Sequence, residues 1–184
     1  PLDQGLTRIL KRYPYAGFKE TFRSEVYGKY AENLPNVRLL TAYRDAGYTL
    51  IPMVRDPRQV WNSFQRHNSG KGTWVSNLED FIQCYMDFLY FIGDTEPIVY
   101  ERFVADPDAE WNIKVGLDLG KLTGIVPRAA RMGDADANKS TDISAVDRPI
   151  CYSDAQKDTI EKSEIMATYH DLLKRGRTIL CGPG

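Results

Sequence analysis

The feature that most restricts the fold is an alternation of short apolar runs with amphipathic stretches along the 184-residue chain. Residues 48–54 form an apolar run of strand length, and a helix is predicted to begin directly after it, at Asp56. A second short run, 97–100, precedes another predicted helix start at Asp106. Strands that alternate with helices pair in parallel. The sequence therefore predicts an α/β fold with a parallel sheet flanked by helices on both faces.

Local signals predict where individual helices begin and end. Asp56 is expected as an N-cap, with Pro57 at the first helical position. Ser76, followed three residues later by Glu79, has the pattern of a capping box, and Gly93 is expected to close that helix.

Further helices and a strand are predicted in the rest of the chain. Helical stretches are predicted over about 25–33 and 35–46. A final helix is predicted from Ser153 to a stop at Gly176, followed by one more strand over 178–181. No repeat or composition boundary divides the chain, so residues 1–184 are expected to form a single domain.

The composition excludes several functional classes. Hydrophobic residues make up 42% and charged residues 27% of the chain, which fits a globular core and not a disordered segment. The net charge is −1, which provides no general positive field for nucleic acid, so any anion site must be local. No apolar run approaches the roughly 20 residues of a membrane span.

Cysteine usage and the N-terminal residues bear on localisation. The three cysteines form neither a CxxC pair nor an even disulfide set, and no basic region leads into an apolar one as in a signal peptide. A cytoplasmic location is therefore expected. The sequence contains no HExxH, clustered Cys/His or DxDxDG pattern that would indicate a metal site, and it carries no signal for an oligomeric state.

The most informative segment is residues 53–63, where Arg55 follows a predicted strand. Ligands of open parallel sheets bind beyond the carboxyl ends of the strands. Ser63 lies on the same predicted helix face as Asp56, so a guanidinium and a hydroxyl could together clamp a phosphate dianion. The alternative is that Arg55 pairs with a local carboxylate and Ser63 is a surface residue of the helix.

This segment, with Arg-Asp-Pro-Arg after a strand and a serine eight residues after the first arginine, resembles the 3′-phosphate-binding segment of sulfotransferases that use 3′-phosphoadenosine-5′-phosphosulfate (PAPS). Residues 98–107 are similar to the tyrosine-glutamate strand end and acidic-proline helix start of the same family. The resemblance covers about residues 35–125. It implies a P-loop NTPase-like architecture and metal-free transfer of a sulfuryl group from PAPS to a hydroxyl or amine of a small-molecule or glycan acceptor.

The resemblance also implies roles for individual residues. Arg55 and Ser63 would hold the 3′-phosphate of PAPS, and Tyr100 would lie near the adenine, although a strand-end or core tyrosine is the alternative. Lys19 could stabilise the departing phosphate, or Glu20 could take the acceptor proton; adjacent strand residues face opposite ways, so both are not expected to serve. His67 is a further candidate base, with a solvated helix-end histidine as the alternative.

The chain departs from the family at the glycine-rich loop that cradles the 5′-phosphosulfate. Residues 68–73 have the composition of such a loop but follow a predicted helix instead of a strand. Residues 177–184 resemble the first strand of the family and the opening of its loop, which would make Gly182 and Gly184 cofactor-binding residues in a permuted site. The alternative is an incomplete sulfotransferase. A kinase-like phosphate-handling protein using Arg55, Arg58 and Lys71, and a non-catalytic nucleotide-binding remnant, also stay open.

Overall fold

Two short strands pair in parallel, and a helix follows each of them. The structure is a computed structural model that describes residues 21–29, 34–67, 75, 77–105 and 150–178. Strand β1 (Met53–Val54) pairs in parallel with β2 (Ile98–Val99), with Met53 opposite Ile98 and Val54 opposite Val99. This pairing confirms the predicted parallel relationship between the runs at 48–54 and 97–100.

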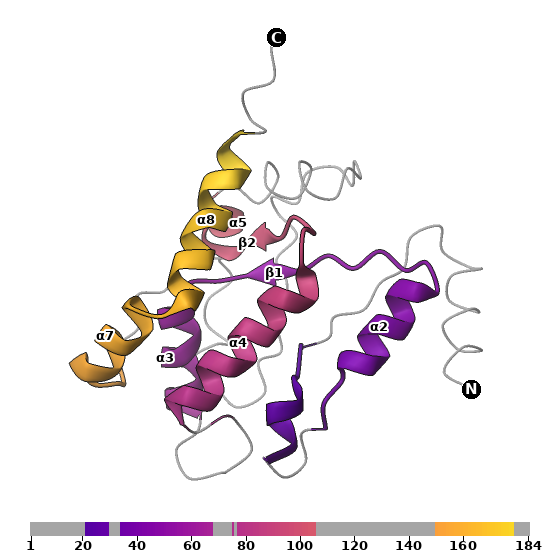
Figure 1. The fold of residues 1–184 in the computed structure, drawn as a ribbon. Helices are drawn as coiled ribbons and strands as arrows, with labels where there is room; N and C mark the ends of the chain where they lie inside the picture. Colours follow the sequence, from indigo (N-terminus) through magenta and orange to yellow (C-terminus); the bar gives the residue numbers. More distant parts are fainter. Residues whose placement is uncertain (1–20, 30–33, 68–74, 76, 106–149, 179–184) are drawn as a thin grey trace, which may run out of the picture.

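Helices make up most of the described chain (Figure 1). In chain order, the helical elements are η1 (Glu25–Lys29), α2 (Val37–Asp45), α3 (Pro57–His67), α4 (Leu78–Ile92), α5 (Tyr100–Ala105), α7 (Asp154–Glu161) and α8 (Glu164–Thr178). The described residues are thus mostly helical with a small parallel sheet, a mixed α/β arrangement. The larger sheet and the P-loop architecture remain predictions.

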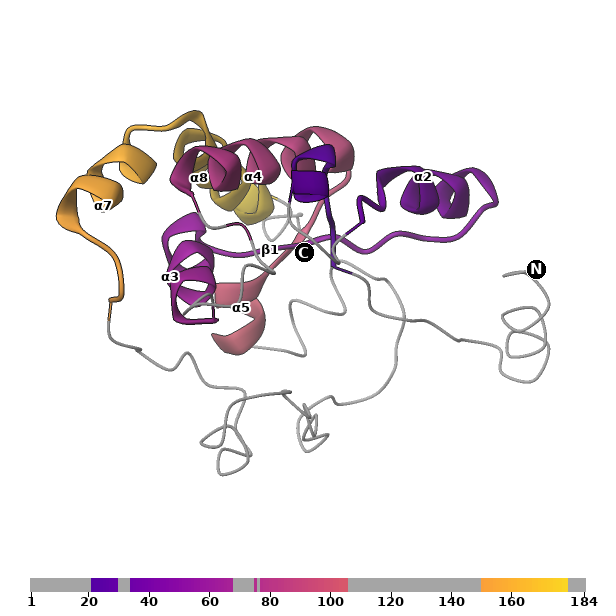
Figure 2. The ribbon, with the colours of Figure 1, turned by 90° about the horizontal axis from the view of Figure 1, so that it is seen from below.

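The helices are distributed around the strand pair. Figure 2 shows α4 and α8 side by side on one side of β1, and α5 on the other side. Helix α3 follows β1 and packs against α4, α7 and α8. The carboxyl ends of β1 and β2 therefore lie among α3, α5 and α8, because α3 and α5 begin where the strands end.

The predicted start of α3 is confirmed in detail. An Asp56 carboxylate oxygen accepts a hydrogen bond from the backbone N–H of Arg58 at 2.8 Å, and Pro57 is the first helical residue. This satisfies one of the backbone donors that a helix start leaves open. Ser153 is likewise the N-cap of α7 and forms a complete capping box with Gln156.

The predicted N-cap of α4 is wrong by one residue. Asn77 caps the helix, and its side-chain oxygen accepts from the backbone N–H of Asp80 at 2.7 Å. Ser76 lies outside the described residues. The two patterns, Ser76 with Glu79 and Asn77 with Asp80, both suit a helix start, so the sequence alone does not separate them. Gly93 closes α4 as expected, with a φ of 53° that favours glycine.

Other element boundaries also differ from the predictions. The strand predicted over 48–54 is reduced to Met53–Val54, and Tyr100 opens α5 instead of ending a strand. The single helix expected from Ser153 is divided into α7 and α8, and α8 continues through Gly176 to Thr178. Glycine lowers helix propensity by only about 1 kcal/mol, so it does not by itself end a helix. The strand expected at 178–181 and the helix expected at Asp106 fall largely outside the described residues.

The core lies between the strands and helices α3, α4, α7 and α8. The indole ring of Trp61 in α3 is fully buried against Phe81 in α4, with 5.1 Å between the ring centroids. Burial of each such side chain stabilises the fold by roughly 1.5–3 kcal/mol. Other buried members of this cluster are Val54, Val75, Tyr85, Leu89, Val99, Ile160, Ile165, Met166 and Tyr169.

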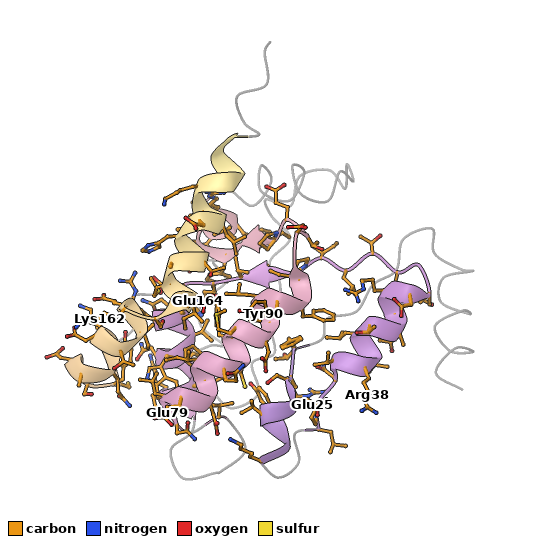
Figure 3. The ribbon with its side chains drawn as sticks, viewed as in Figure 1. Glu25, Arg38, Glu79, Tyr90, Lys162 and Glu164 are labelled. Atoms are coloured by element: carbon orange, nitrogen blue, oxygen red, sulfur yellow. The ribbon has the colours of Figure 1, made fainter. Side chains whose placement is uncertain are left out.

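The opposite, polar side of these helices faces solvent. Figure 3 labels Glu79 on α4 and Glu164 on α8, both exposed, and Tyr90, whose side chain is 68% exposed on α4. Of the helices that the structure describes, none is both long and apolar enough to cross a membrane.

Candidate functional site

The structure brings together two of the residues predicted to bind the nucleotide. Arg55 follows β1 and Tyr100 follows β2, so the parallel pairing places both at one end of the sheet. The guanidinium carbon of Arg55 lies 4.6 Å from the centroid of the Tyr100 ring. At this distance the π-electrons of the ring attract the cation. Tyr100 therefore supports the arginine side chain from one face.

The nearest carboxylate along the chain is occupied by another arginine. Arg58 donates to both oxygens of Asp56, and its Nη2 atom lies 2.6 Å from Oδ2. A further hydrogen bond of 3.2 Å joins Arg58 to Glu161 in α7. The hydrogen bond with Asp56 raises the pKa of the Arg58 guanidinium, so the arginine keeps its charge. Asp56 is thus held at the start of α3 by its cap and by Arg58.

The second nearby carboxylate, Glu101, is also occupied. Its Oε1 atom accepts a hydrogen bond of 2.9 Å from the backbone N–H of Asp56. Its Oε2 atom accepts one of 2.8 Å from the hydroxyl of Tyr169 in α8. Burial, together with this carboxylate, raises the pKa of Tyr169 above its ordinary value, so the hydroxyl keeps its proton and donates.

A third contact fixes the end of β1. The buried hydroxyl of Tyr85, in α4, donates a hydrogen bond to the backbone carbonyl of Arg55. Burial raises the pKa of Tyr85, which keeps this hydroxyl a donor at neutral pH. The carbonyl of Arg55 and the N–H of Asp56 belong to the same peptide group, so side chains hold both of its polar atoms just beyond the last strand residue.

These contacts leave the charge of Arg55 available. Within the described part of the chain, Arg55 forms no ion pair, and its buried Nε atom has no hydrogen-bond partner. Burying the Nε–H donor of this half-buried guanidinium costs free energy unless an acceptor forms a hydrogen bond with it. The alternative in which Arg55 pairs with a local carboxylate therefore does not hold among the described residues. The arrangement suits an anionic oxygen ligand.

The other predicted site residues are not brought into this group by described contacts. Ser63 is half-buried in α3, two turns after Asp56, and its role stays a prediction. His67 is the last residue of α3, and its side chain is outside the described part. Lys19, Glu20, Gly182 and Gly184 lie outside the described residues altogether.

Sequence reasoning does not find the residues that hold the strand ends. Glu101 belongs to the family motif, but the resemblance assigns it no role. Tyr85 and Tyr169 lie on the core-facing stripes of their predicted helices, which gives no sign of a contact with the strand ends. For Glu101 the sequence does contain a signal, because a carboxylate just past the end of one strand can reach the free backbone N–H groups where the paired strand ends. Among the described residues, no group of three or more His, Cys, Asp or Glu side chains is arranged to hold a metal ion.

Comparisons of the chain with protein-family models, curated proteins and solved structures found no match. The resemblance to sulfotransferases therefore rests on the residues and spacings of the chain itself.

Proposed function

We propose that the protein is a PAPS-dependent sulfotransferase that moves a sulfuryl group to a hydroxyl or amine of a small-molecule or glycan acceptor. The observation that carries this proposal is the Arg55 guanidinium, which stands at the carboxyl ends of two parallel strands without an ion-pair partner among the described residues. A ligand with a terminal phosphate would supply the acceptor oxygens that Arg55 lacks. The 3′-phosphate of PAPS is such a group.

The described residues fit one half of the nucleotide. Arg55 would hold the 3′-phosphate, with the Tyr100 ring behind its guanidinium. Ser63 would add a neutral hydroxyl from α3. The transferred sulfuryl group would be handled by side chains outside the described part, with those of Lys19, Glu20 and His67 as the candidates for stabilising the leaving group or removing the acceptor proton.

Isothermal titration with adenosine 3′,5′-bisphosphate tests the nucleotide half of the proposal. Micromolar binding, with AMP bound at least about 10-fold more weakly, is expected if one charge-assisted contact is specific to the 3′-phosphate. Absence of measurable heat with the bisphosphate would contradict the proposal. Binding that requires Mg²⁺ and ATP would instead indicate a kinase-like protein.

A second experiment tests the transfer step. Incubation with ³⁵S-labelled PAPS and a panel of hydroxyl and amine acceptors should give labelled product, with adenosine 3′,5′-bisphosphate as the other product. Tight binding of the bisphosphate without transfer to any acceptor would favour a non-catalytic nucleotide-binding protein.

A further inference from the structure

Glu101 connects three elements where the two strands end. It is the second residue of helix α5, and this helix begins directly after β2. One carboxylate oxygen binds the backbone N–H of Asp56 after β1, and the other binds Tyr169 in α8. A half-buried carboxylate with both oxygens engaged in this way restricts the motion of both hydrogen-bond partners.

The first effect of these contacts is on the peptide group that follows Arg55. Its carbonyl accepts from Tyr85 and its N–H donates to Glu101. The backbone hydrogen bonds between the strands end at Val54 and Val99. The side chains of Tyr85 and Glu101 take the place of those bonds for one further peptide group. Fixing this peptide restricts the ψ angle of Arg55 and thereby the direction in which its side chain leaves the backbone.

The second effect is on the ring beneath the guanidinium. Tyr100 precedes Glu101 in the first turn of α5, and the next residue, Arg102, donates to the backbone carbonyl of Leu173 in α8. Two consecutive side chains therefore attach the start of α5 to α8, at Tyr169 and one turn later at Leu173. The backbone of Tyr100 is held next to this double attachment.

We propose that Glu101 is a positioning residue that aligns Arg55 with Tyr100 and so prepares the guanidinium to bind an anion. The expected effect of Glu101 on ligand binding rests on the proposed function. The expected effect on the geometry of Arg55 does not, because it can be measured without ligand. Glu101 does not itself offer a favourable contact to an anionic ligand, because its carboxylate carries the same sign of charge.

The ligand-free test is the ring-current shift of the Arg55 δ-protons in the NMR spectrum. The Tyr100→Leu variant gives the reference chemical shift of these protons when no ring lies beside them. Glu101→Ala should move the shift most of the way to that value, whereas Glu101→Gln should keep it, since an amide can accept from Asp56 N–H and donate to the Tyr169 oxygen. Tyr169→Phe, which removes one of the two hydrogen bonds, should give an intermediate shift.

The binding test is the ratio of the AMP and adenosine 3′,5′-bisphosphate dissociation constants. Glu101→Ala should lower this ratio about 10-fold, which corresponds to the contribution of one charge-assisted hydrogen bond, while Glu101→Gln should restore it. The matched control is Asp171→Asn, which removes an exposed carboxylate from α8 where it pairs with Lys174. This control should leave both the ring-current shift and the ratio unchanged.

The outcomes separate the two proposals. A normal ring-current shift in Glu101→Ala overturns the positioning role. If Glu101→Ala does not fold, an unchanged shift in Tyr169→Phe overturns it instead, and an intermediate shift supports it. A shift that responds to Glu101 in a protein that binds no bisphosphate would support the positioning role and contradict the proposed function.

Discussion

The guanidinium of Arg55 rests on the ring of Tyr100, with 4.6 Å from Cζ to the ring centroid. Each residue directly follows one of two paired parallel strands. The carboxylates of Asp56 and Glu101 are engaged by Arg58, Tyr169 and the Asp56 backbone, and no carboxylate among the described residues pairs with Arg55, which leaves its charge for a ligand. The predictions on ligand binding follow from this relationship.

Arg55→Ala should weaken binding of adenosine 3′,5′-bisphosphate by about 10- to 150-fold, because a charge-assisted contact is worth roughly 1.5–3 kcal/mol. Binding of AMP should change much less, because AMP lacks the 3′-phosphate. The matched control is Arg44→Ala, which removes another arginine that lies over an aromatic ring, that of Phe91 at 5.4 Å. Isothermal titration of the original protein and both variants with each ligand provides the dissociation constants. Equal weakening of both ligands by Arg55→Ala would contradict a 3′-phosphate role.

Tyr100→Phe should bind the bisphosphate nearly as well as the original protein, whereas Tyr100→Leu should bind it about 2- to 30-fold more weakly. The phenylalanine keeps the ring that supports Arg55, and a cation–π contact is worth about 0.5–2 kcal/mol. If Tyr100 instead contacts adenine through its hydroxyl, Tyr100→Phe should weaken AMP and the bisphosphate alike. Titration of both ligands with both variants decides between these roles.

Ser63→Ala should produce a smaller decrease in bisphosphate affinity than Arg55→Ala, because a neutral hydroxyl contributes about 0.5–1.5 kcal/mol net. The melting temperature should hardly change, since Asp56 and Pro57 already start α3. A large fall in melting temperature with unchanged affinity would identify Ser63 as a structural residue.

Asn77→Ala should lower the free energy of unfolding by about 1 kcal/mol, because it removes the acceptor for the Asp80 backbone N–H at the start of α4. Glu79→Gln is the matched control, since Glu79 is exposed in the same turn and belongs to the capping pattern that the structure does not adopt. Urea unfolding of both variants is the measurement. A larger effect from Glu79→Gln than from Asn77→Ala would contradict the assigned cap.

Stability should fall between about pH 9 and pH 11 in a way that depends on Cys84. Burial raises the pKa of the Cys84 thiol to about 11. In this range the unfolded chain releases the thiol proton while the folded chain keeps it, so the free energy of unfolding decreases with rising pH, by at most about 1.4 kcal/mol per unit. Cys84→Ala should show a shallower decrease in the free energy of unfolding when urea unfolding is measured at about pH 9 and about pH 11.

Thiol titration checks the same assignment without a stability measurement. At pH 8 the folded protein should have the same number of fast-reacting thiols with and without Cys84, because the buried thiol is almost entirely protonated. In denaturant, the Cys84→Ala variant should have one fewer. Fast reaction of Cys84 in the folded protein would show that it is not buried.

The features that depend on neighbouring residues can be predicted from the sequence alone. The start of α3 at Asp56 and Pro57, the capping box of Ser153 and the glycine end of α4 follow from side chains that satisfy backbone groups one to four residues away. The parallel pairing of two runs also follows from periodicity, since strands separated by helices can pair in few ways. The candidate residue Arg55 emerges from its position after an apolar run, whereas Tyr100, the last residue of the run 97–100, is a candidate only through the resemblance to sulfotransferases.

The partners of the charged side chains at the strand ends depend on how the helices pack on the sheet. The sequence shows Asp56, Arg58 and Glu101 near Arg55 along the chain or after the neighbouring strand, but any of the carboxylates could have paired with Arg55. The hydroxyl that Glu101 binds belongs to Tyr169, which comes from α8 and reaches the strand ends only when this helix packs on the sheet. A hydrogen bond between residues far apart in the chain forms only when the packing of the core brings their atoms within about 3 Å. No local pattern specifies that distance.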